Sequence, residues 1–128
     1  MEKDFDGWNK QKKKVNNKRF APYFEIREVW WCSLGLNVGF EQDGTSNLYR
    51  RPVLVLKKWS SDTCLILPVT SSLSRHPYRI SIGTIGGRAS YVIVSQAKTI
   101  DARRFGEKIT TLDSEHFEYV RKTTRESL

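Results

Sequence analysis

The sequence has few of the residues from which metal sites and disulfide frameworks are built. Its 128 residues include only two cysteines, Cys32 and Cys64, and two histidines, His76 and His116. Their spacing matches no metal-ligand motif. Both cysteines lie in apolar, strand-like segments, where a free cysteine is usually buried. We therefore expect no metal, no cofactor and reduced thiols.

Long hydrophobic runs are also absent. No apolar segment approaches the roughly 20 residues that span a membrane. The segment from Met1 to Asn17 is charged and lacks the apolar stretch of a secretion signal. There are no internal repeats, and the one low-complexity tract is a lysine cluster around residues 12–14. These absences predict a cytoplasmic protein without a membrane partner.

The composition nevertheless suffices for a folded core and has a clear charge bias. A length of 128 residues fits one domain. A hydrophobic fraction of 38% with 12% aromatics argues against global disorder. The formal net charge is +8. Because Lys and Arg displace counterions from phosphates, this excess favours a polyanionic partner such as RNA, DNA or an acidic protein tail.

The chain divides into a basic N-terminal extension, residues 1–26, and a domain, residues 27–128. Phe5, Trp8, Lys12 and Val15 lie near helical spacing, so the extension is expected to be helical over about residues 3–16. It is interpreted as a solvated extension, or alternatively as an arm that binds a polyanion or a partner.

The domain is predicted to be mainly β with one C-terminal helix. Asp113 suits the N-cap of that helix, and Leu112 and Phe117 stand at the positions of a hydrophobic staple. Five or more short strands with close turns indicate a small barrel, or a sheet with a helix packed on it. Strands are expected at 27–34, 52–59, 63–69, 78–82 and 90–95, with short extended pieces around Ile100 and Ile109 and a long loop over 35–50.

Polar side chains with useful chemistry flank the second and third of these strands. Arg51 precedes Pro52, and its planar guanidinium suits a phosphate in a pentacoordinate transition state. Arg50 is the alternative, on the opposite face if the strand has begun there. Thr70 and Ser71, at the end of the third strand, offer hydroxyls that could hold a phosphate oxygen or a ribose 2′-hydroxyl. Such a set could cleave RNA without a metal ion.

Further polar residues lie in the long loop and beside the later strands. Glu41 could accept a proton or bind a base edge, and Gln42 could anchor the loop or read a base. A set of basic residues could line an RNA groove, with Phe40, Tyr49 or Trp59 as stacking surfaces. These basic residues are Arg88, Lys98, Arg103 and Arg104. Equally, the aromatics could belong to the core and the charges to a solvated rim.

Four short motifs, taken in order, resemble the MazF/PemK family of toxin endoribonucleases. The first is a G-x-E-Q-x-G loop, residues 39–44, and the second an R-P-V-L-V strand that begins at Arg51. The third is L-P-V-T-S at 67–71, and the fourth S-Q-A-K-T-I-D at 95–101. The correspondence covers about residues 27–124.

This resemblance implies an SH3-like barrel in a homodimer that cleaves single-stranded RNA, usually mRNA, to 2′,3′-cyclic phosphate and 5′-hydroxyl ends. It implies a cognate antitoxin with an acidic disordered tail across the RNA groove, and contact with operator DNA only through that antitoxin. The matching catalytic pair is Arg51 and Thr70. The site-forming residues would be Glu41, Gln42, Ser71, Arg50 and Gln96.

Two positions depart from the family pattern. Ser95 stands where some members have an acid, and Ile93 stands where PemK-like members place an arginine. An acid–base pair built from those positions is absent, so the mechanism is expected to depend on Arg51 and Thr70. Two other functions remain open from the sequence: a non-catalytic nucleic-acid-binding barrel, and a toxin of the same fold that poisons a topoisomerase.

Overall fold

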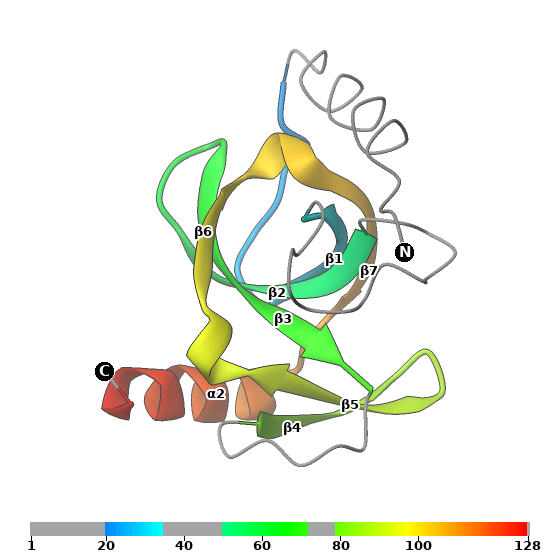
Figure 1. Ribbon diagram of the computed structural model, residues 1–128, viewed down its shortest axis with the longest axis vertical. Coiled ribbons are helices and arrows are strands. Elements are labelled where there is room, and N and C mark those ends of the chain that lie inside the picture. The colour runs from blue at the N-terminus through cyan, green and yellow to red at the C-terminus, as the bar shows by residue number, and fades with distance from the viewer. Residues whose placement is uncertain (1–19, 35–49, 72–78, 128) are drawn as a thin grey trace, which may run out of the picture.

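The computed structural model describes residues 20–34, 50–71 and 79–127 (Figure 1). The helix expected over residues 3–16 therefore lies outside the described residues. The same holds for the long loop before Arg50, and with it for Glu41 and Gln42. Within the described residues, no helix has the length and apolarity that crossing a membrane requires.

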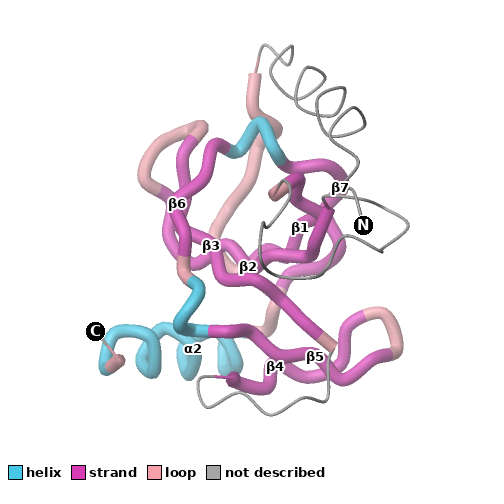
Figure 2. Tube along the Cα trace, viewed as in Figure 1, coloured by secondary structure: helices cyan, strands magenta, loops and turns pink. Residues whose placement is uncertain are grey.

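The described chain forms an antiparallel sheet and one α-helix, so the prediction of a mainly β domain with a C-terminal helix is confirmed (Figure 2). The expected strands all form, with boundaries that shift by a few residues. Their bounds are β1 Glu28–Ser33, β2 Arg50–Lys58, β3 Thr63–Thr70, β4 Arg79–Ile85, β5 Arg88–Ile93, β6 Lys98–Asp101 and β7 Phe105–Thr111, followed by α2 Ser114–Glu126.

The larger part of the sheet follows the order β6-β3-β2-β1-β7. Its two outer strands, β6 and β7, are consecutive in the chain and separated only by a 3₁₀ turn, Ala102–Arg104. Because so short a connection joins the two outer strands, the sheet must curl until they come near each other. Figure 1 shows this curl as a half-barrel.

A second layer branches from β3. The last residues of β3 pair with β5, and β5 pairs with β4. The β4–β5 hairpin turns at Gly86 and Gly87, with φ of 59° and 80° that a glycine adopts without strain. Helix α2 packs on this branch and contacts β4 (Figure 1).

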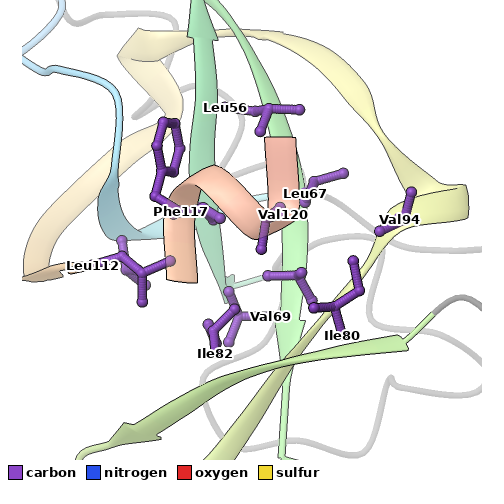
Figure 3. Packing of buried hydrophobic residues seen from close by; sticks show 12 residues of the cluster. Leu56, Leu67, Val69, Ile80, Ile82, Val94, Leu112, Phe117 and Val120 are labelled. Atoms are coloured by element: carbon purple, nitrogen blue, oxygen red, sulfur yellow. The ribbon is translucent and has the colours of Figure 1, made fainter. Parts of the chain in front are cut away.

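Two hydrophobic clusters lie on opposite faces of the sheet. One fills the space between the sheet and α2, where Phe117, Val120 and Leu112 meet Leu67 and Ile82 (Figure 3). The other lies inside the curl, where Phe105 stacks on Trp30 with ring centroids 5.1 Å apart and meets Phe24 edge-on at 5.5 Å. Phe24 is fully buried, so a residue assigned above to the extension contributes to the core.

The two cysteines belong to the inner cluster. Both are free and fully buried, as the sequence predicted. Burial, and secondarily the charge of Asp101, raises the pKa of Cys64 to about 12. Its thiol therefore stays protonated at neutral pH.

Two strand boundaries differ from the prediction. β2 begins at Arg50 rather than Pro52, because residues 50–52 pair with β1. Proline has no backbone N–H to donate to a neighbouring strand. At Pro52 the edge of β2 that faces β3 is open, because β3 pairs with β2 only up to Val53 and then pairs with β5, so the proline is tolerated there. β5 ends at Ile93, and Val94–Gln96 form a 3₁₀ turn as the chain passes from β5 to β6.

Helix α2 begins as the sequence predicted. The Asp113 carboxylate accepts a hydrogen bond from the His116 backbone N–H at 2.9 Å, and its other oxygen lies 2.6 Å from His116 Nδ1. Leu112 and Phe117, at the staple positions, are both buried. The hydrogen bond from the His116 backbone N–H, followed by that with the His116 ring, lowers the pKa of Asp113 below the ordinary carboxyl range.

We expect Asp113→Ala to lower the melting temperature at neutral pH, because the first turn of α2 loses its cap. Asp113→Asn should retain most of the stability, since asparagine also caps helices. Because the pKa of Asp113 is lower in the folded state, its carboxylate adds to folding stability at pH values above its unfolded pKa of about 4. This added stability is lost as the pH falls through the lower pKa of the folded state. Thermal unfolding between neutral pH and acid should therefore show a smaller loss for Asp113→Asn than for the wild type.

Candidate functional site

The candidate site lies where β2 and β3 separate. The two strands pair up to the rung Val53↔Pro68. Beyond it, residues 50–52 of β2 stay with β1, whereas residues 69–70 of β3 pair with β5. We call this region, residues 50–52 and 69–71, the fork. In Figure 1, β3 runs past β2 towards β5.

Arg51 and Thr70 occupy equivalent places on the two branches of the fork. Arg51 lies two residues before Val53, and Thr70 two residues after Pro68, both at the same end of the ladder. Opposite Cα atoms in a rung are about 5 Å apart, and two extended residues span about 7 Å. The Arg51 and Thr70 Cα atoms are therefore at most about 19 Å apart.

The two side chains also leave the same face of the sheet. Side chains alternate along a strand, so Arg51 shares a face with Val53 and Thr70 with Ile66. Val53 and Ile66 both belong to the cluster inside the curl. The predicted pair is thus placed on one end and one face of the sheet.

Arg51 is half-buried at this position. Burial lowers the pKa of its guanidinium, which remains a cation because arginine titrates far above neutral pH. No described residue forms an ion pair or hydrogen bond with it. A partly desolvated cation without a described counter-ion favours the approach of an anion, such as a phosphate.

Arg50 points to the other face, as alternation requires. Its guanidinium lies 2.7 Å from Glu107 and 5.4 Å from the centre of the Trp31 ring. It passes over Gly106, where a Cβ atom would come within 3.1 Å of Arg50 Nη2. The structure therefore places Arg50 in a surface ion pair on the face opposite Arg51, which separates the two candidates.

Two further predicted residues lie near the fork. Ser71 follows Thr70 and is exposed. Gln96 is also exposed and lies in the 3₁₀ turn between β5 and β6. β5 pairs with β3 at Val69↔Val92, and β6 pairs with β3 at Ile66↔Lys98. Gln96 is thus near Leu67 and Pro68, on the edge of β3 opposite β2. Glu41 and Gln42 lie outside the described residues.

A pocket of about 250 Å³ opens between the end of β1 and β6. Leu34, Lys98 and Arg104 line it, together with Thr99, Ile100 and Asp101. Arg103 donates a hydrogen bond to the Asp101 carboxylate at 2.7 Å, and this bond, followed by the charges of Arg103 and Arg104, lowers the pKa of Asp101. Among the described residues, no three His, Cys, Asp or Glu side chains gather as metal ligands.

The remaining predicted groove residues are dispersed. Arg103 is paired with Asp101, and Arg88 is exposed on the β4–β5 hairpin. Trp59 follows the far end of β2 and does not reach the fork. Phe40 and Tyr49 lie outside the described residues.

The structure also shows a row that the sequence analysis missed. Thr70, Tyr91 and Ser81 lie directly opposite one another across β3, β5 and β4. The Arg79 guanidinium lies 4.0 Å from the centre of the Tyr91 ring. Strands were predicted at 78–82, from its alternation, and at 90–95, but such local patterns give no information about which strand pairs with which.

Comparison with known proteins places this geometry in a family. The family model for the PemK-like, MazF-like toxin of type II toxin–antitoxin systems matches residues 25–128. No match was found among curated proteins.

Solved structures with similar folds include three examples, each below 25% identity. MazF from Deinococcus radiodurans is 22% identical with a TM-score of 0.62, and the alignment covers 84% of this chain and 96% of that chain. A MazE–MazF complex from the same organism is 19% identical with a TM-score of 0.59, and the alignment covers 84% of this chain and 95% of that chain. An endoribonuclease in complex with its cognate antitoxin from Mycobacterial species is 14% identical with a TM-score of 0.56, and the alignment covers 84% of this chain and 93% of that chain.

The structural likenesses establish a shared fold, and the family model covers well over half of the chain. The predicted resemblance is thereby confirmed: the chain belongs to the PemK-like, MazF-like toxins of type II toxin–antitoxin systems.

Proposed function

We propose that the protein is a metal-independent endoribonuclease that cleaves single-stranded RNA, with mRNA as its usual substrate. One observation carries the proposal: Arg51 and Thr70 lie just beyond the last paired residues of β2 and β3, at the same end and on the same face of the sheet. A phosphodiester held at the fork would meet a guanidinium from one strand and a hydroxyl from the other.

The reaction proposed is attack of the ribose 2′-oxygen on the adjacent phosphorus, with cleavage of the bond to the 5′-oxygen. The products are a 2′,3′-cyclic phosphate and a 5′-hydroxyl. Arg51 would stabilise the charge that builds on the phosphorane oxygens, because its fork matches two of them. The Thr70 hydroxyl would hold a phosphate oxygen or orient the attacking 2′-hydroxyl.

Other residues would bind the flanking RNA. Ser71 and Gln96 lie beside the fork and offer polar groups to phosphate or base edges. Glu41 and Gln42, which precede β2 in the sequence, are proposed to contact the substrate. Arg50 would support the entrance to β2 through Glu107. The cations of the pocket, Lys98 and Arg104, would attract the RNA backbone.

The proposal includes the protein partners expected of a type II toxin. A cognate antitoxin with an acidic, disordered tail would inhibit the enzyme, and operator DNA would be contacted only through that antitoxin. The net charge of +8 suits such a tail. Two of the three similar structures named above are complexes, one of MazE with MazF and one of an endoribonuclease with its cognate antitoxin. We also propose a homodimer, in which the facing subunit would help to select the cleaved sequence.

Incubation of the purified protein with a long RNA in EDTA tests the proposed function. We expect discrete fragments that carry cyclic phosphate ends, because no metal ion takes part in the proposed steps. The Arg51→Ala protein, purified in the same way, serves as the control for a contaminating nuclease.

Three outcomes separate the functions. Cleavage that requires a divalent ion would contradict the proposed mechanism. Binding without cleavage would favour a non-catalytic nucleic-acid-binding barrel. Intact RNA together with growth arrest in cells would favour a toxin that acts on another enzyme, such as a topoisomerase.

A further inference from the structure

A second groove, of about 520 Å³, lies between the end of β2 and the C-terminal half of α2. Its apolar lining comes from Ile26, Leu56 and Leu65. Cationic and aromatic side chains surround this floor. We call it the Trp59 groove; its other lining residues are Lys57, Lys58, Trp59, Arg121, Thr124 and Arg125.

The Trp59 groove is separate from the fork. Arg51 lies near the first residue of β2, and Lys58 is its last residue. Seven residues of extended strand span about 23 Å. One molecule bound at the scissile position therefore does not have to enter this groove, and the proposed cleavage does not explain it.

The charges around the Trp59 groove are of one sign. Among the described residues that line it, four are Lys or Arg and none is Asp or Glu. Lys58 forms an ion pair with Glu25 at 3.8 Å, and Arg121 forms one with Glu118 at 3.4 Å. Lys57 and Arg125 form no ion pair with a described residue, and both are exposed. One stands on β2 and the other on α2, so they flank the apolar floor.

Trp59 adds an exposed apolar surface at the rim. The residue is 50% exposed, and exposed aromatic residues are enriched at interfaces. The Lys57 ammonium lies 4.7 Å from the centre of its ring and covers part of one face. An aliphatic floor beside a large exposed ring is suited to bulky apolar side chains.

We infer that the Trp59 groove binds a segment of a partner protein in which acidic residues flank large aliphatic ones. The aliphatic side chains would pack on Leu56, Leu65 and Trp59, and the carboxylates would meet Lys57 and Arg125. Charge argues against the chain's own N-terminal segment, since residues 1–19 contain seven Lys and Arg but three Asp and Glu. A single-stranded nucleic acid would stack its bases on aromatic rings and would place no apolar group on the aliphatic floor.

Calorimetric titration of the full chain with short synthetic peptides tests this inference. The probe peptide alternates Leu with Glu and Asp. Two matched peptides replace either its Leu residues by Ser or its acidic residues by Lys. We expect binding of the first peptide only, and NMR shifts at Trp59, Lys57 and Arg125 that map it to the groove.

Charge reversal then locates the interaction. The double variant Lys57→Glu with Arg125→Glu should raise the Kd at least about tenfold, because two attractive contacts become repulsive. Lys122→Glu is the matched control, since Lys122 is an exposed cation of α2 that does not line the groove. It should leave the Kd within about twofold. Cleavage of RNA by the double variant should be unchanged, which keeps this test separate from the proposed function.

Three results would overturn the inference. The first is no binding of the Leu-containing acidic peptide at millimolar concentration. The second is binding that the double variant does not weaken. The third is a single-stranded oligouridylate that produces the NMR shifts at Trp59 while the peptide does not, which would make the groove a nucleic-acid surface.

Discussion

Replacing Arg51 by alanine is expected to reduce the rate of RNA cleavage by about 10³-fold or more, since one preorganised charge at a transition state contributes that much. The guanidinium is the one charged group that the described chain places on the inner face of the fork, at the same end of the sheet as Thr70. Its removal should leave the melting temperature nearly unchanged, because no described residue forms an ion pair or hydrogen bond with it. Single-turnover cleavage of a labelled RNA, together with thermal unfolding, measures both effects.

Arg50→Ala provides the matched comparison for this result. It removes the same side chain one position earlier, from the opposite face, and breaks an exposed ion pair with Glu107. Such pairs contribute little to stability, and we expect a loss of cleavage below about tenfold. Arg51→Lys should recover only part of the rate, since an ammonium cannot form the two parallel bonds of a guanidinium. A rate that falls with Arg50→Ala and survives Arg51→Ala would reverse the assignment.

Replacing Phe105 by alanine is expected to lower the free energy of unfolding by about 3–5 kcal/mol. Phe105 is 1% exposed and joins β7 to two other segments of the inner cluster. It stacks on Trp30 and pairs with Cys32, both on β1, and it meets Phe24 edge-on. Its loss would open a cavity at the place where the curl of the sheet is held together. Urea denaturation followed by circular dichroism gives the magnitude.

Phe20→Ala serves as the control, since Phe20 is 78% exposed. We expect a change of about 0.5 kcal/mol or less there. If Phe105→Ala were equally mild, the inner cluster would not be the element that stabilises the curl. A variant that does not fold at all would agree with the expectation, and Phe105→Leu then supplies a measurable intermediate loss of about 1 kcal/mol.

Much of the secondary structure was readable from the sequence for local reasons. The apolar run after Pro52 and the alternation at 78–82 predicted strands, and Asp113 predicted the start of α2 within one residue. These signals depend on near neighbours in the chain. The start of β2 at Arg50 and the 3₁₀ turn at Val94–Gln96 were missed, because each depends on which strand lies alongside.

The candidate site was predictable only in part. Ordered motifs identified the family, and the roles that they suggest for Arg51 and Thr70 stay a prediction. The choice between Arg51 and Arg50 required the strand register, which decides the face from which each side chain leaves. The Arg79–Tyr91 pair and the Trp59 groove were not predicted, because their residues come from elements that only the fold brings together.

By itself, the sequence determined the residue types, the excess of positive charge, the family motifs and the local preference for short strands and one terminal helix. The tertiary structure alone decided that β3 leaves β2 at Pro68, and so which side chains share the fork and which face away. The physical reason is that strand pairing is a contact between distant segments. Side-chain alternation specifies two faces for each strand, but only burial against the rest of the chain selects the face that points into the curl.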